Sequence, residues 1–367
     1  MERFEYADNF IGEREILVSV PSMVIGVGML SLPRQIASPT VAADGLIAIV
    51  TGGVLVILLT WLIAKLASVF PQQNFIDYAS LLTSRPLAIV FTSLLAVQGL
   101  LLAAFETRVI ADVAKQYLFD QTPNGVIGLS FLLVVIYAVS GTRAGLFRLN
   151  MMFLPIILFI SVLVMLFTTG MFEGGNLLPV LKTDISGHWD ALKQSIYSYI
   201  GVGTLLFYTA LVKKPDNVPK KACLGMLIVI MLYAFVYVVC IAVFGNLVAG
   251  NLLYPTIELA KDVQIPGGFF ERFESLFFVI WIMAIFNTTA MAFDVSVFAL
   301  NAIFRKDRKM QLIFLLAPLV YIIGMTPNDT AEVSAFGMYV GYYGTFVTAG
   351  ITVLLLITAK WRGVTKL

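Results

Sequence analysis

Charged side chains, histidine and cysteine are all scarce in this sequence. Only 13% of the 367 residues are charged, the formal net charge is +2, and there are one histidine and two cysteines. Cys223 and Cys240 would lie about 25 Å apart in one helix, too far for a disulfide. The sequence has no cluster of metal ligands, no phosphate-binding loop and no acid, base and nucleophile set, and its basic residues form no long patch. We therefore predict no enzyme activity, cofactor, metal or nucleic-acid partner.

Apolar side chains are present in excess. Hydrophobic residues make up 59% of the chain, and the mean hydropathy is +0.93. A water-soluble domain of this size could not bury so much apolar surface, so we expect membrane lipid to surround the protein. Because no polar linker divides the chain, we predict one integral membrane domain.

Long apolar runs recur along the whole chain. About 20 apolar residues cross a bilayer as a helix, and lipid offers no partner for unpaired backbone groups. The sequence therefore predicts an all-α membrane protein with about ten transmembrane helices. We place these spans near residues 16–37, 44–69, 86–119, 123–140, 147–169, 190–212, 220–245, 272–304, 309–325 and 333–358.

The basic residues indicate how the chain is oriented. Lysine and arginine are concentrated in the cytoplasmic loops of membrane proteins. If the first span starts inside, the basic clusters all fall on the inner side: Lys213–Lys214, Lys220–Lys221, Arg305–Lys309 and Lys360–Lys366. Both termini are therefore predicted to be cytoplasmic.

Two spans carry nearly the same string. The first contains Ile25–Leu30 (IGVGML) and the sixth contains Ile200–Leu205 (IGVGTL), each well inside its helix. Such glycines are common where helices pack closely. Matching breaks in spans of opposite direction are also typical of inverted-repeat transporters, and we favour that interpretation. It predicts a five-plus-five inverted repeat with broken first and sixth helices, residues 1–170 forming one repeat and 171–367 the other.

A broken helix suits a ligand that carries opposite charges. Its free N–H groups attract a carboxylate, and its free carbonyls accept hydrogen bonds from an ammonium group. An amino acid provides both groups. The candidate ligand-binding residues at the two breaks are Gly26, Val27, Gly28, Tyr199, Gly201, Val202 and Gly203.

Ionisable residues inside the third span are further candidates. Such groups are costly in lipid and point to a cavity by default. Arg108 and Asp112 are four residues apart and can form a structural pair. Glu106 has no basic residue at either matching position, so it is the better candidate for a ligand contact.

Polar residues also interrupt the eighth span. Asn287 and Thr288 could contact a ligand, or could hydrogen-bond a neighbouring helix. Asp294 lies further toward the cytoplasmic side. A proton-coupled or ion-coupled cycle would require Glu106 or Asp294.

Several motifs resemble the B subunits of spore germinant receptors, which belong to the amino acid–polyamine–organocation transporter superfamily. The resemblance covers almost the whole chain, and the motifs keep their order and spacing. They are Gly26–Pro33, Phe105–Arg108, Asn176–Leu181, Tyr254–Ile257 and Glu271–Ser275.

The resemblance implies a ten-helix, LeuT-like inverted repeat in the inner membrane of bacterial spores. It also implies an A subunit and a C subunit as partners, and a nutrient ligand such as an amino acid or a sugar. Several members carry an acidic residue where this sequence has Gly203, so its ligand can differ from theirs. Whether Glu271–Ser275 contacts a ligand or another subunit stays open.

Three functions are consistent with these features. The favoured one is a nutrient-sensing subunit of a germination receptor, which binds a small solute at the broken helices and signals to its partners. The alternatives are an ion- or proton-coupled amino acid transporter and a non-binding membrane scaffold of a receptor complex.

Overall fold

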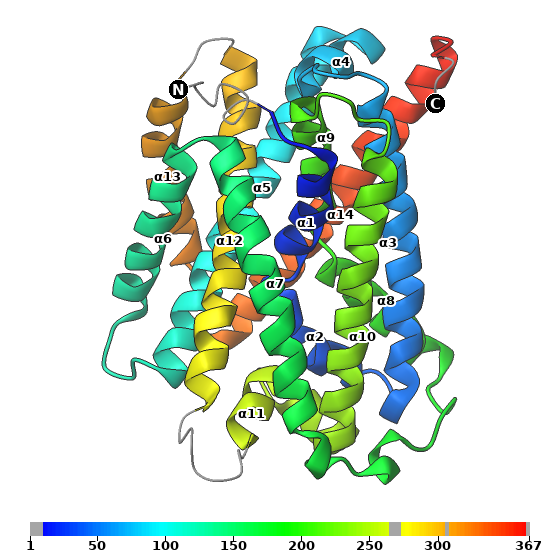
Figure 1. Ribbon diagram of the computed structural model, residues 1–367, viewed down its shortest axis with the longest axis vertical. Coiled ribbons are helices and arrows are strands. Elements are labelled where there is room, and N and C mark those ends of the chain that lie inside the picture. Colours follow the sequence, from blue (N-terminus) through cyan, green and yellow to red (C-terminus); the bar gives the residue numbers. More distant parts are fainter. Residues whose placement is uncertain (1–9, 264–272, 305–307, 365–367) are drawn as a thin grey trace, which may run out of the picture.

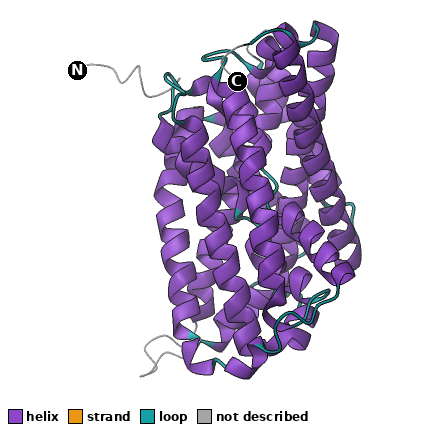
Figure 2. Ribbon diagram, turned by 90° about the vertical axis from the view of Figure 1, so that its right-hand side faces the viewer, coloured by secondary structure: helices purple, strands orange, loops and turns teal. Residues whose placement is uncertain are grey.

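The protein is a bundle of helices that run roughly along its longest axis (Figure 1). The computed structural model describes residues 10–263, 273–304 and 308–364. Helix is by far the main regular structure of this part of the chain (Figure 2). Glu271 and Arg272, from the last of the resemblance motifs, lie outside the described residues.

Among the described residues, six helices are long and apolar enough to cross a bilayer alone. Their exposed surfaces carry large apolar side chains, for example Val54, Phe159 and Phe346, as expected of helices that face lipid. The six are α3 (Gly45–Ser68), α5 (Arg85–Tyr117), α7 (Arg143–Phe167), α10 (Val218–Asn251), α12 (Phe273–Phe304) and α14 (Thr330–Trp361).

Shorter and broken helices supply the remaining spans. α6 (Asn124–Ser140) and α13 (Lys309–Gly324) are short apolar helices. α1 (Glu13–Val24) and α2 (Gly28–Ala37) form one span bent by 54°. These elements, with a second broken span described next, confirm the all-α architecture of about ten spans.

The sixth span is broken more severely than the first. Its first half is α8 (Ile185–Ser198), and its second half consists of η5 (Val202–Thr204), α9 (Leu205–Tyr208) and η6 (Thr209–Leu211). Between them Gly201 has φ +125°, a conformation that strongly favours glycine. The predicted break is therefore present, but only a mixture of short helical turns follows it.

Short elements cap both ends of the bundle. α4 (Phe75–Leu82) lies at one end, which we call the α4 end, and α11 (Pro255–Asp262) lies at the other, the α11 end (Figure 1). η2 (Ala42–Asp44), η3 (Thr169–Met171) and η4 (Gly174–Leu177) lie in connections outside the long helices. The start of α1 and the end of α14 both lie at the α4 end (Figure 1).

Candidate ligand-binding site

The two broken spans meet at their glycines. A Cβ added to Gly28 would lie 3.0 Å from the Ser198 carbonyl oxygen, at the end of α8. A Cβ added to Gly201 would lie 2.9 Å from the Met23 carbonyl oxygen in α1. Because no other residue lacks a Cβ, glycine permits this backbone-to-backbone approach. Each of the two similar strings therefore packs against the residues that precede the other break.

Neighbouring helices satisfy carbonyl groups beside the first break. The Tyr233 hydroxyl of α10 donates to the Val24 carbonyl at 2.8 Å, and the Thr288 hydroxyl of α12 donates to the Ser22 carbonyl at 3.0 Å. A break inside a membrane requires such partners, because lipid supplies none. α10 and α12 therefore hold α1 in its broken shape.

The carboxylate of Glu106 lies directly against the same break. The Val27 amide donates to Glu106 Oε1 at 3.4 Å, and a Cβ on Gly26 would lie 2.8 Å from that oxygen. Glu106 is 3% exposed. Within the described residues, Oε2 has no hydrogen-bond partner, and Glu106 takes part in no ion pair. A buried carboxylate in this state has strong unused capacity to bind a cation or a hydrogen-bond donor.

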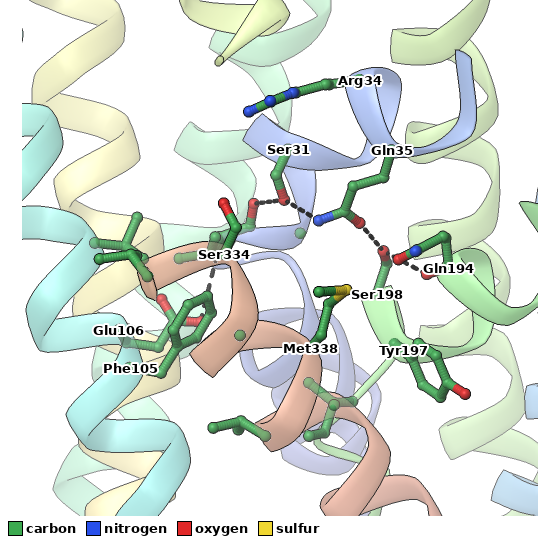
Figure 3. Close-up of a pocket in the computed structure, with 18 of the residues that line it drawn as sticks. Ser31, Arg34, Gln35, Phe105, Glu106, Gln194, Tyr197, Ser198, Ser334 and Met338 are labelled. Carbon is green, nitrogen blue, oxygen red and sulfur yellow. Dashed lines mark hydrogen bonds between the residues drawn. The ribbon is translucent and has the colours of Figure 1, made fainter. Parts of the chain in front are cut away.

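A cavity of about 440 Å³ lies beside Glu106 and extends toward the α11 end. This volume is within the range typical of pockets for small molecules. Its walls come from α1, α2, α5, α8, α12 and α14, and Figure 3 shows their side chains converging on the cavity. Phe105 and Met338 contribute apolar surface.

Polar side chains connect the two broken spans along one wall. The Gln35 amide donates to Ser31 Oγ at 3.3 Å, and Ser198 Oγ donates to Gln35 Oε1 at 3.4 Å. Ser31 Oγ in turn donates to the Val27 carbonyl at 3.3 Å (Figure 3). This chain gives a polar ligand donors and acceptors next to the first break.

The structure brings one group of the predicted site residues to the cavity. Val27, Gly28, Glu106 and Thr288 line it. Gly26 borders this group, since its added Cβ would lie 2.7 Å from Thr288 Oγ1. Residues of the third and eighth spans therefore join the first break, as their polar character suggested.

The other predicted residues lie away from the cavity lining. The Tyr199 hydroxyl donates to the Ile49 carbonyl, so its side chain holds α8 against α3. Gly203 and Val202 are buried, and an added Cβ on Gly203 would meet Thr348 of α14. Asn287 is fully buried. Gly201 shapes the turn and contacts Met23.

Asp294 belongs to a separate cluster nearer the α4 end. Its Oδ2 accepts from Arg143 Nε at 3.1 Å and from the Tyr208 hydroxyl at 3.1 Å. The Arg143 guanidinium lies 3.9 Å from the centre of the Phe298 ring. This cluster ties α7, α9 and α12 together on the side of the break opposite the cavity.

Sequence reasoning missed several cavity residues. The cavity lining includes Ser31, Arg34, Gln35 and Ser38. Their spacing from Val27 places them on the same face of the helix as Val27. The periodicity of a helix face would have identified them once Val27 was accepted as a site residue. The lining residues of α14 carry no such signal, because nothing local in the sequence places α14 against the first break.

Comparison with known proteins identifies the family. Residues 11–333 match the profile of the family described as "Spore germination protein". Spore germination protein GerLB of Bacillus cereus is 40% identical over 99% of this chain and 98% of its own length. Spore germination protein YndE of Bacillus subtilis is 28% identical over 94% of this chain and 95% of its own. The chain belongs to the spore germination protein family. This membership confirms the resemblance found in the sequence motifs.

A solved structure confirms the fold of this spore germination protein. The structure of MhsT in complex with L-phenylalanine superposes with a TM-score of 0.68, covering 96% of this chain and 98% of MhsT. The sequence identity is 14%, so the likeness concerns the fold alone. The spore germination protein is thus a multi-pass integral membrane protein with a LeuT-like transporter fold.

Proposed function

We propose that this protein is the nutrient-sensing subunit of a spore germinant receptor, and that it binds a small amino compound in the cavity at the first break. The observation that carries the proposal is the Glu106 carboxylate, which is buried at the break and lacks an ion pair among the described residues. A ligand ammonium group would supply the missing partner. The Thr288 hydroxyl oxygen and the Ser31–Gln35–Ser198 chain would hold its other polar groups.

The place of the cavity in the bundle is compatible with a sensor and with an outward-facing transporter. Leu253 and Tyr254, which precede α11, belong to the cavity lining, whereas the Arg143–Asp294–Tyr208 cluster does not. Ligand binding that stabilises one conformation can signal to a neighbour or drive transport. The alternative, a coupled amino acid transporter, would have Asp294 or Glu106 exchange a proton or an ion, and a scaffold would bind no ligand.

The family supports a proposal for the location and the partners. We propose that the protein lies in the inner membrane of the spore with the α4 end and both termini in the cytoplasm. Lys65, Arg143, Lys220 and Lys360 then lie near the cytoplasmic side, as the distribution of basic residues favours. We further propose that it assembles with an A subunit and a C subunit, and that the two repeats divide near residue 170.

A binding titration tests the proposed site. Purified protein in lipid nanodiscs is titrated with each of the 20 standard L-amino acids and with D-glucose, and the tightest binder is carried forward. We expect Glu106→Gln to weaken its binding by about tenfold or more, because a charge-assisted hydrogen bond is lost. Glu173→Gln, which removes a carboxylate from an exposed loop position, is the matched control and should bind normally. Equal binding by both variants would contradict the proposal.

Uptake separates the sensor from the transporter. The same binder, radiolabelled, is given to sealed proteoliposomes with and without sodium and proton gradients. A sensing subunit binds the compound saturably but does not accumulate it. Concentrative uptake would assign the protein to the transporter alternative, and saturable binding by no compound would favour the scaffold.

A further inference from the structure

The charged residues that line the cavity are not all neutralised. They are Arg34, Glu106, Asp112, Asp190 and Lys193. Lys193 and Asp190 form an ion pair at 2.6 Å. Asp112 pairs with Arg108 at 3.0 Å. Among the described residues, Arg34 and Glu106 take part in no ion pair. The cavity therefore contains one unpaired charge of each sign.

Arg34 and Tyr254 both line the cavity. Burial and the Asp112 carboxylate raise the pKa of Tyr254, whereas the Arg34 and Arg108 guanidinium groups lower it. Tyr254 precedes α11, and the Asp112 carboxylate is already paired with Arg108. Glu258 of α11 adds no free negative charge, because Lys261 pairs with it at 2.9 Å. Arg34 is therefore the lining cation of the cavity that takes part in no ion pair among the described residues.

The two unpaired charges lie at different depths of one cavity. Arg34 is seven positions after Val27 on α2, which corresponds to about 10 Å along a helix axis, and the flexible arginine side chain can cover part of that distance. Glu106 lies at the break itself, and Figure 3 shows Arg34 and Glu106 on opposite sides of the drawn cavity. The cavity is therefore polarised, negative at the break and positive toward the α11 end.

We propose that Arg34 is a specificity-determining residue that binds the carboxylate of a dipolar ligand whose ammonium group meets Glu106. This inference rests on the proposed function, since it assumes a ligand at Glu106. It reassigns the ligand's carboxylate from the free N–H groups of the broken helix to a guanidinium, which is well suited to bind carboxylates. Amines without a carboxylate and neutral sugars should then bind poorly.

Ligand derivatives test the proposal without any change to the protein. The tightest-binding amino acid of the panel is compared with its carboxamide, which keeps the ammonium group, and with its N-acetyl derivative, which keeps the carboxylate. We expect each derivative to bind about tenfold or more weakly than the parent, because each loses one charge-assisted contact. A carboxamide that binds as tightly as the parent would overturn the role of Arg34.

Variants then assign the effect to Arg34. Arg34→Gln should weaken binding of the parent amino acid by about tenfold or more and leave binding of the carboxamide unchanged. Arg34→Lys keeps the charge, so it should retain part of the preference for the amino acid over its carboxamide. Lys182→Gln removes an exposed positive charge near the same end and serves as the control for long-range electrostatics. This variant should prefer the amino acid over its carboxamide as strongly as the wild type does.

The outcomes distinguish this inference from the proposed function. If Glu106→Gln weakens binding but Arg34→Gln lowers affinity for acid and amide equally, the site stands and the role of Arg34 falls. If no amino acid of the panel binds, the proposed function fails as well. If Arg34→Gln binds the amino acid no more tightly than its carboxamide, while its binding of the carboxamide is unchanged, both the proposed function and the role of Arg34 are supported.

Discussion

At the scale of single residues, Gly26 keeps the ligand site open. A Cβ at this position would lie 2.7 Å from Thr288 Oγ1 and 2.8 Å from Glu106 Oε1. Both contacts are with side chains, which can shift, so Gly26→Ala should fold. We expect it to displace the Glu106 carboxylate and weaken ligand binding by about tenfold. Gly350→Ala adds the same methyl group where nothing lies within 4 Å, and its titration should match the wild type.

Gly201 is needed for a different reason, namely its backbone conformation. Its φ is +125°, and an added Cβ would lie 2.9 Å from the Met23 carbonyl oxygen, which cannot move without moving α1. We expect Gly201→Ala to lower the free energy of unfolding by about 3 kcal/mol. Thermal unfolding in detergent measures this loss as a lower Tm than that of Gly350→Ala. Equal Tm values would show that the turn tolerates a side chain.

The sequence identified these glycines but could not assign their roles. Two similar strings indicated two breaks. Ile200 of the second string lines the cavity, whereas Gly201, Val202 and Gly203 shape and pack the sixth span. Tyr199 was predicted to be at the site because it adjoins the second string. A side chain's direction depends on the local turn, and here its hydroxyl reaches Ile49. Neighbouring position in the chain does not determine that direction.

At the scale of elements, Asp44 anchors the connection that leads into the sixth span. Its carboxylate accepts from the backbone amides of Leu181, Lys182 and Thr183 and from the Thr183 hydroxyl, at 2.5 to 2.8 Å. Asp44 is 2% exposed. This single side chain fixes the loop before α8 against the start of α3.

Removal of this anchor should loosen the connection. Asp44→Ala leaves three amides without their acceptor, so we expect a loss of about 3 kcal/mol or more in the free energy of unfolding. Limited proteolysis should cut the loop between η4 and α8 faster, and the Tm should fall. Asp120→Ala, at an exposed turn, should change neither quantity. Unchanged proteolysis of Asp44→Ala would mean that other contacts hold the loop.

The sequence predicted some helices more accurately than others. Long spans were predicted well because apolar length is a strong signal. The predicted end of the seventh span at residue 245 coincides with Gly245, whose φ of +71° interrupts α10, although helix resumes to Asn251. α4 is too short to give a spanning signal, so it was not predicted. Cavity residues contributed by α14 depend on tertiary packing, which a single sequence does not reveal.

At the scale of the whole molecule, the Arg143–Asp294 pair joins α7 to α12. Asp294 is almost fully buried, whereas the Arg143 side chain is 21% exposed and also lies over Phe298. Loss of the arginine would leave a buried carboxylate without a counter-charge. Loss of the carboxylate would leave a cation that water and the ring can still stabilise.

The two single variants should therefore differ. We expect Arg143→Gln to cost about 3–5 kcal/mol of stability and Asp294→Asn clearly less. In the double variant the carboxylate is absent, so its Tm should lie nearer to that of Asp294→Asn. A double-mutant cycle, measured by thermal unfolding in detergent, gives the stability losses of the two single variants and of the double variant. Equal losses in the two single variants would contradict a buried, arginine-dependent carboxylate.

The most direct measurement of the ligand site is a cryo-EM structure of the protein with the amino acid that binds it most tightly. We expect ligand density at the first break, with the ammonium group at the Glu106 carboxylate and the remainder in the cavity toward Arg34. Ligand density at any other place, without a contact between the ligand and Glu106, would contradict the site.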